Sequence, residues 1–441
     1  MRLSRRKVDF WLHAGIFSLY LGTLSVFGFA RRLDDTLGNA ALFGLLALTL
    51  ALLVYAALRT RGVPLFGLVL LGLLPFVHYV AFVATGASTT GAYIYLYKFG
   101  GFLLAPFVWL WVRRHDDSQV ERVLMLLGLV TALRALLAFA LPGVHPGGGG
   151  TGSPAFADDF SIYERVGGFA RVFYPGMALV FLGLLISLER ILSGRARQVW
   201  PDVLTAALFG AALLVTLSRG TVIFAVLLTS LYILVRLLQR PAAHLRLARV
   251  GLGGLVALNA LALVLTFSSV GAAVDTSLVG LTRSDRLTLD RANITWRERQ
   301  VRLAFSLVNT EERRLFGVGT HTLIPGNPDL LTGATNDLHY SYHSILWTFG
   351  YVGLGLLMVF GIVQPLLRAL RARGQLVLPF AFTTLFIALV GAYTIVFTTP
   401  DWNFMLCLCA AYLNARAWRR RPASAPESSG LQGARSGAVS L

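Results

Sequence analysis

The stretch Asn39–Leu58, NAALFGLLALTLALLVYAAL, decides the fold class, because it contains no charged residue. A helix of about 20 apolar residues crosses the hydrocarbon core of a membrane, which is about 30 Å thick. Similar runs recur along the chain, and together they predict an all-α integral membrane protein with about 12 transmembrane helices. The predicted spans are Phe10–Ala30, Asn39–Leu58, Val63–Thr85, Gly91–Val112, Val120–Leu141, Gly168–Leu192, Val199–Leu217, Thr221–Val235, Ala248–Phe267, Ser344–Leu367, Leu376–Phe397 and Trp402–Ala417.

The composition agrees with a membrane protein and excludes an ordinary soluble domain. Of the 441 residues, 56% are hydrophobic and 14% are charged, and the mean hydropathy is +0.68, whereas a soluble domain carries about 25% charged residues. The formal net charge of +18 could suggest a nucleic-acid partner. The basic residues, however, punctuate the apolar runs instead of clustering on one soluble face. We therefore expect membrane lipids, and no nucleic acid, among the partners.

Basic residues occupy every second connection between the predicted spans. Cytoplasmic loops collect Lys and Arg, whereas translocated loops do not. The pattern predicts that both termini are cytoplasmic, and that the first apolar segment is a membrane helix and no cleavable signal peptide. The basic connections contain Arg2, Arg5, Arg6 and Lys7; Arg59 and Arg61; Arg113, Arg114 and Arg122; Arg190, Arg195 and Arg197; Arg236, Arg240, Arg246 and Arg249; Arg368, Arg371 and Arg373; and Arg416, Arg419, Arg420 and Arg421.

The connections divide the chain into four predicted regions. Residues 1–267 hold nine spans, with a glycine-rich outer loop at 142–167, and residues 344–417 hold the last three. Between them, residues 268–343 form an outer loop that is too long for a simple connector. Its segment Arg291–Val308 places apolar residues along one face of a helix, so the loop is predicted to be partly helical. Residues 418–441 are rich in Ser, Ala and Gly, and we expect a disordered cytoplasmic tail.

Three charged side chains within the predicted spans are candidates for a binding site. Lys98 lies in the fourth span, Arg134 in the fifth and Arg171 near the start of the sixth. A charge inside a membrane costs about 2.5 to 3.5 kcal/mol on insertion scales, so such residues are functional candidates. The alternatives are snorkelling to the interface or pairing with a structural carboxylate.

Arg219 stands out because it interrupts a very short outer connection between the seventh and eighth spans. A single basic residue there runs against the positive-inside bias. An anionic partner would explain it, and pyrophosphate is the natural candidate because a guanidinium can bind phosphate oxygens bidentately. Anchoring to a lipid headgroup is the alternative.

His339 lies immediately before the tenth span, with His343 one helical turn later. An imidazole has a pKa near 6.5, which suits it to accept the proton of an attacking sugar hydroxyl. The sequence contains no outer Asp-x-Asp cluster for a divalent ion on a pyrophosphate, and no nucleotide-binding fingerprint. We therefore expect no metal and no cofactor. The two cysteines, Cys407 and Cys409, lie in an apolar run and are interpreted as packing residues.

Four stretches resemble the superfamily of O-antigen ligases and O-antigen polymerases. Thr216–Gly220 resembles its Ser-Arg-Gly element, and Arg165–Phe169, leading through Tyr174-Pro175-Gly176, resembles its Arg-x-x-Gly-x-Phe segment. Leu315–Gly319 is similar to the loop core that ends in Gly-x-Gly. His339, followed by Gly350 and Gly353, is similar to the loop-end histidine that enters a helix, and this spacing selects His339 over His343. The sequence departs from the family at Tyr340, where Asn is common.

The resemblance implies a function at the periplasmic face of a bacterial inner membrane. That function is the inverting transfer of a glycan from undecaprenyl pyrophosphate to an acceptor sugar hydroxyl, without a metal. It implies that His339 activates the acceptor, while cationic side chains bind the pyrophosphate. The residues implied for the pyrophosphate are Arg219, Arg165, Arg171, Lys98 and a loop arginine, Arg297 or Arg291.

Within this superfamily, the alternative functions differ in the acceptor that they use. A ligase uses the lipid A core, a polymerase uses another lipid-linked repeat, and a related branch glycosylates proteins. The large basic outer loop favours the ligase, because it suits an anionic lipid A core. A transporter or flippase with twelve spans is the alternative from another class. Transporters typically show internal repeats, and no convincing repeat relates the two halves of this chain.

Overall fold

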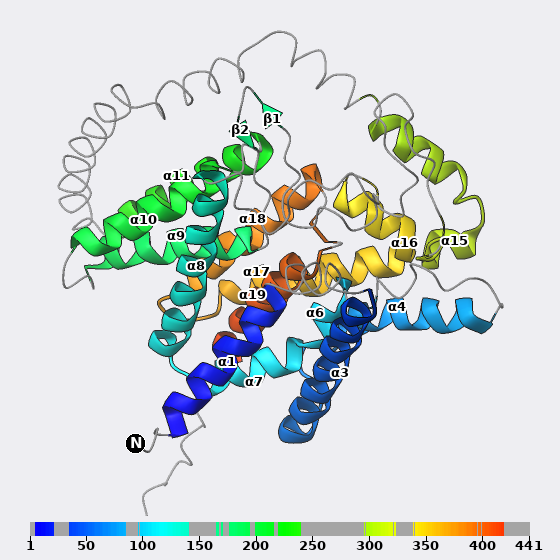
Figure 1. Ribbon diagram of the computed structural model, residues 1–441, viewed down its shortest axis with the longest axis horizontal. Helices are drawn as coiled ribbons and strands as arrows, with labels where there is room; N and C mark the ends of the chain where they lie inside the picture. Colours follow the sequence, from blue (N-terminus) through cyan, green and yellow to red (C-terminus); the bar gives the residue numbers. More distant parts are fainter. Residues whose placement is uncertain are drawn as a thin grey trace, which may run out of the picture.

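The computed structural model describes residues 5–21, 35–84, 96, 98–140, 165–166, 169–170, 176–194, 199–215, 219–239, 295, 297–320, 322, 338, 340–394, 396–397 and 399–418. Regular structure in this part of the chain is helical apart from one short hairpin (Figure 1). The hairpin pairs β1 (Arg165–Val166) with β2 (Phe169–Ala170) in antiparallel register, with Arg165 opposite Ala170. The predicted all-α class is thus confirmed for the described residues.

Long apolar runs form the helices of the first half of the chain. Helix α8 begins beside Asp116, whose carboxylate accepts a hydrogen bond from the Gln119 N–H at 2.8 Å and so satisfies a donor of the first turn. The helices are α1 (Arg5–Leu21), α3 (Asp35–Thr60), α4 (Phe66–Ala84), α6 (Gly100–Leu103), α7 (Ala105–Arg114) and α8 (Asp117–Ala140).

In the second half of the chain, α16 passes through a π-helical segment, Leu357–Val363, into α17. Together they cover Ser341 to Ala369, with a kink at Gly350. The helices are α9 (Met177–Ser193), α10 (Val199–Leu214), α11 (Arg219–Gln239), α15 (Glu311–Phe316), α16 (Ser341–Leu356), α17 (Gln364–Ala369), α18 (Val377–Tyr393) and α19 (Pro400–Trp418). Residues 297–306 are also helical, as predicted for this part of the large loop.

Helix α19 is the centre of the bundle. It contacts α1, α6, α7, α9, α17 and α18, and every residue from Pro400 to Arg416 is buried. Cys407 and Cys409 lie there as buried free thiols, consistent with a packing role. Helices α8, α9 and α10 form a second packed group, in which a side chain on Gly183 would overlap the fully buried ring of Phe209. Small residues let membrane helices approach closely in this way.

The outer surface of the bundle is apolar. Leu58, Val80 and Leu204 are 76%, 65% and 68% exposed, an arrangement that suits lipid tails and would be unfavourable in water. Among the described helices, three are long and apolar enough to cross a membrane: Ala40–Thr60, Gly220–Gln239 and Ser341–Ala369. Shorter apolar helices cover Val8–Leu21, Phe66–Ala81, Val199–Leu214 and Val377–Tyr393. The chain is a multi-pass membrane protein.

The described helices overlap nearly all of the predicted spans, and one span begins later than predicted. Every span except Ala248–Phe267 coincides with a described helix or helix pair; that one lies outside the described residues, so the number of about 12 stays a prediction. The sixth span was predicted to begin at Gly168, which is wrong. Phe169 and Ala170 form β2 instead, and α9 begins at Met177. Gly176 adopts a left-handed φ of +86° immediately before α9. This conformation cannot continue a right-handed helix, so α9 begins after Gly176.

Candidate active site

The start of α16, directly after His339 in the chain, is bonded to the connection between α18 and α19. Ser341 is fully buried, and its hydroxyl donates to the carbonyl of Thr394 at 2.7 Å. The same oxygen accepts from the N–H groups of Val396, at 2.5 Å, and Phe397, at 3.2 Å. One side chain therefore satisfies three backbone groups of the connection, and this fixes where α16 begins.

The same connection holds two further segments. The carboxylate of Asp401 accepts from the N–H of Gly176 at 2.8 Å, at the end of the Tyr-Pro-Gly element. The amide of Asn403 donates to the carbonyls of Lys98, at 2.8 Å, and Phe397, at 3.0 Å. The start of α9 and the backbone at Lys98 are thereby tied to the start of α19.

The glycine of the Ser-Arg-Gly element, Gly220, lies against this connection as well. Gly220 is buried, and any side chain at this position would overlap the ring of Tyr393 at the end of α18. Arg219 is the first residue of α11, so its backbone lies next to this contact. Tyr393 directly precedes Thr394, which binds Ser341. The backbones next to Arg219 and His339 in the chain thus meet the same short stretch.

The Gly-x-Gly element of the large loop docks on a kink in α16. Gly350 interrupts the helical dihedrals with φ 64° and ψ −164°, a conformation that is essentially restricted to glycine. A side chain on Gly350 would overlap the backbone carbonyl of Leu315, and one on Gly317, whose φ is +79°, would overlap the backbone of Thr348. The two glycines therefore allow direct contact between the backbones.

Backbone hydrogen bonds complete this docking. The kink frees two carbonyls of α16, which then accept from the loop: the N–H of Val318 donates to Trp347 at 2.9 Å, and that of Gly319 to Thr348 at 3.2 Å. Leu315–Gly319 and Gly350 belong to two separate stretches that resemble the superfamily. In the structure they form one contact.

A small apolar cluster anchors the helix of residues 297–306 above the start of α16. It is separate from the main core of the bundle. Leu338, the residue before His339, is fully buried there, and its N–H donates to the hydroxyl of Ser344 at 3.3 Å. The other members are Val301, Ala304, Phe305, Val308, Val318 and Trp347. The chain is therefore held on both sides of His339.

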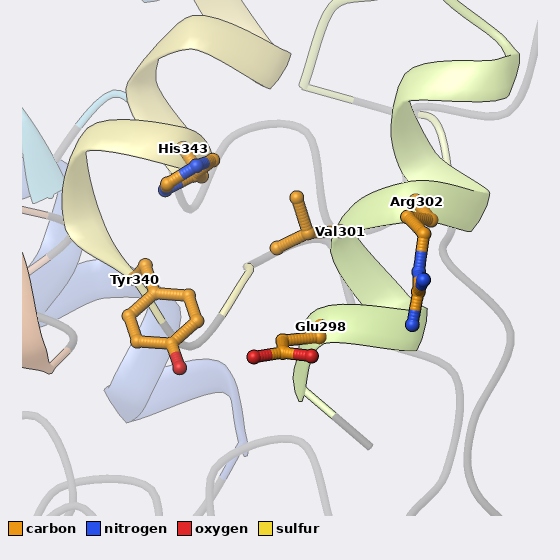
Figure 2. Close-up of a pocket in the computed structure, with 5 residues that line it drawn as sticks. All are labelled: Glu298, Val301, Arg302, Tyr340 and His343. Carbon is orange, nitrogen blue, oxygen red and sulfur yellow. The ribbon is translucent and has the colours of Figure 1, made fainter. Parts of the chain in front are cut away.

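A pocket of 420 Å³ opens between this helix and the start of α16. Figure 2 shows its lining: Glu298, Val301 and Arg302 from the loop helix, and Tyr340 and His343 from the first turn of α16. The ring centroids of Tyr340 and His343 lie 5.6 Å apart. Among the described residues, no group of three His, Cys, Asp or Glu side chains is arranged as a metal site.

The predicted site residues differ in how far the structure describes them. His339, Arg171 and Arg291 lie outside the described residues, and for Arg219 and Arg165 only the backbone is described, in α11 and β1. Lys98 and Arg297 are described, and both are half-buried. The roles assigned to these seven residues stay predictions.

Sequence reasoning missed Ser341, Asp401, Asn403 and Glu298. The first three are polar residues at the edge of apolar runs. This signal is visible in the sequence, although it does not say what they bind.

Comparison with known proteins adds independent information. Residues 204–358 match the profile of a family described as O-antigen ligase. That range includes α11, the described part of the large loop and the start of α16 up to and beyond Gly350. No curated protein matches the chain. The chain therefore carries an O-antigen ligase domain at residues 204–358, and this domain is that of an enzyme.

Proposed function

We propose that this enzyme transfers a glycan from undecaprenyl pyrophosphate to a sugar hydroxyl of the lipid A core. In this proposal the reaction takes place at the periplasmic face of a bacterial inner membrane, with inversion at the anomeric carbon and without a metal ion. Both termini are cytoplasmic, and residues 268–343 form the periplasmic loop.

The observation that carries the proposal is the convergence of the motif-bearing segments on one connection. Residues 393–403 contact Gly220 next to Arg219, bind Ser341 two residues after His339, and bind Gly176 and the backbone of Lys98. Segments far apart in sequence meet at one end of the bundle. Transfer between two large substrates requires such convergence, because the donor phosphates and the acceptor hydroxyl must be held together.

The chemistry follows from the residue types. His339 takes the proton of the acceptor hydroxyl while its oxygen attacks the anomeric carbon from the face opposite the leaving group. The bond between that carbon and the pyrophosphate oxygen breaks, and undecaprenyl pyrophosphate leaves. Arg219, Arg165, Arg171 and Lys98, with Arg297 or Arg291, stabilise the charge that develops on the leaving group. Guanidinium groups suit this task because they bind phosphate oxygens bidentately and keep their charge at every physiological pH.

The charge of the described part of the loop supports the lipid A core as acceptor. Residues 297–316 contain five arginines and three glutamates. Arg299, Arg302, Arg313 and Arg314 are exposed, so they are available to an anionic partner. Basic groups close to a membrane attract phosphorylated lipids and sugars over about a Debye length.

An in vitro transfer assay with purified lipid-linked glycan and lipid A core tests the site. We expect His339→Ala to lower the rate about 10²- to 10⁴-fold, the range for loss of a general base. We expect Arg219→Ala to lower it about 10²- to 10³-fold, because one stabilising donor is lost. The matched control is Arg373→Ala, the same change at an exposed arginine between α17 and α18 and outside the proposed site, and it should keep most of the rate. Full transfer by both test variants would refute the assignment.

Deletion of the gene tests the acceptor. Loss of a ligase should leave the lipid A core without O-antigen. Capped single repeats on the core would instead identify a polymerase, and the proposed acceptor would be wrong.

A further inference from the structure

The pocket between the loop helix and α16 has a mixed lining. Glu298, Arg302 and His343 are exposed, and Val301 and Tyr340 are half-buried. Figure 2 shows the side chains of Glu298 and Val301 directed toward Tyr340 and His343 across the opening. A carboxylate, a guanidinium, an imidazole and a phenol therefore surround one space, together with the apolar side chain of Val301. Its volume of 420 Å³ falls within the range of about 300–1,000 Å³ typical of small-molecule sites.

The charge of this lining selects among the parts of the two substrates. The carboxylate of Glu298 offsets the positive charge of Arg302, so the lining has no net positive charge that would attract a pyrophosphate. The carboxylate would accept hydrogen bonds from sugar hydroxyls, and bonds to a charged acceptor are stronger than those between neutral groups. The aromatic rings of Tyr340 and His343 present flat faces, which suit the apolar C–H face of a sugar ring. The lining thus fits a polyhydroxylated, uncharged unit.

The position of the pocket favours the acceptor over the donor. Tyr340 directly follows His339 in the chain, and its carbonyl accepts the N–H of Ser344 in the first turn of α16. A sugar bound against Tyr340 therefore contacts the residue next to the proposed base in the chain. The donor is fixed through its pyrophosphate and lipid, and this pocket offers no net positive charge for the pyrophosphate.

We infer that the pocket lined by Glu298, Val301, Arg302, Tyr340 and His343 is a subsite for one neutral sugar of the acceptor. Glu298 binds its hydroxyls, and the ring of Tyr340 packs on its face. The inference rests on the proposed glycan transfer and adds the residues that recognise the acceptor. These residues determine acceptor affinity and take no part in breaking the donor bond.

Binding and kinetics test the subsite separately. The binding probe is delipidated core oligosaccharide, titrated against the full-length protein in nanodiscs. Glu298→Gln should weaken its affinity about tenfold, the size of one charge-assisted hydrogen bond. Tyr340→Leu should weaken it by a similar factor, whereas Tyr340→Phe should keep it. In the transfer assay the KM for the acceptor should rise by the same factors, with the KM for the lipid-linked donor unchanged.

Two variants serve as references. Glu311→Gln makes the same chemical change on α15, at an exposed residue outside the pocket, and should leave both constants unchanged. His339→Ala should lower the transfer rate about 10²- to 10⁴-fold yet bind the oligosaccharide like the wild type. A free repeat-unit oligosaccharide, titrated in parallel, shows which acceptor the subsite prefers.

The outcomes separate the subsite from the proposed reaction. Unchanged acceptor affinity in Glu298→Gln and Tyr340→Leu, or a raised KM for the donor alone, would overturn the subsite even where transfer depends on His339. If the wild type binds the oligosaccharide through Glu298 and Tyr340 but forms no glycosidic bond, the subsite stands and the proposed reaction fails.

Discussion

Substitution of Gly350 by alanine should detach the large loop from the bundle. The backbone of Gly350 has φ 64° and ψ −164°, and an added side chain would overlap the carbonyl of Leu315. Such a conformation costs a non-glycine residue about 1–3 kcal/mol. The loop moves away to avoid the overlap, and the two hydrogen bonds from Val318 and Gly319 then break. Because the strain acts only on the docked state, it shifts the docking equilibrium by about 1–3 kcal/mol, or about 5- to 150-fold.

Trypsin is a direct reporter of this equilibrium. Residues 297–316 contain five arginines, and cleavage of a folded segment follows the population of its open form. We expect Gly350→Ala in nanodiscs to be cut in this segment at least about five times faster than the wild type, with the membrane helices intact. Transfer should fall in parallel.

The control for this substitution lies in the same helix. Gly355 has no atom within 4 Å of the position of an added Cβ, so Gly355→Ala should leave cleavage unchanged and stabilise α16 by about 0.5–1 kcal/mol. Equal cleavage and equal transfer in Gly350→Ala and the wild type would show that the docking has no role in holding the loop.

Three further substitutions test the other contacts. Ser341→Ala leaves buried backbone N–H groups without an acceptor at about 1–3 kcal/mol each, so thermal stability and transfer should both fall, whereas Ser306→Ala, the same change at an exposed serine, should alter neither. Asp401→Ala removes the acceptor for the N–H at the start of α9, and its kcat should fall further below the wild type than that of Asp401→Asn. Glu189 is 1% exposed and lies 2.6 Å from Arg236; Glu189→Ala should therefore cost about 3–5 kcal/mol of stability, and the apolar pair Glu189→Leu with Arg236→Met should restore the melting temperature.

The positions of the helices could be predicted well from sequence, because hydropathy alone decides which segments enter a membrane. The exact limits could not. The run from Gly168 is apolar enough to extend the sixth span, but the left-handed backbone of Gly176 sets its start. Gly176 is held by Asp401, which lies 225 residues away in sequence. Such a contact depends on tertiary structure, which a local pattern does not contain.

The candidate site was predictable only in part. The motifs identified segments that do lie together, such as Leu315–Gly319 and Gly350. The α18–α19 connection carries no sequence signal for its role, because Thr394, Val396 and Phe397 act through their backbones. Any residue type supplies those backbone groups. Glu298 is one of several charged residues in the loop, and only its neighbours across the pocket distinguish it.

At this end of the bundle, backbone groups hold the segments together and side chains line the pocket. The loop docks through glycines and main-chain hydrogen bonds, and the start of α16 is fixed by main-chain groups of the α18–α19 connection. These contacts place constraints on few side chains, so the exposed face of the 297–306 helix is free to differ in its side chains without loss of docking. Substitutions at Glu298 and Arg302 can therefore change which acceptor is bound, while the geometry that brings donor and acceptor together stays the same.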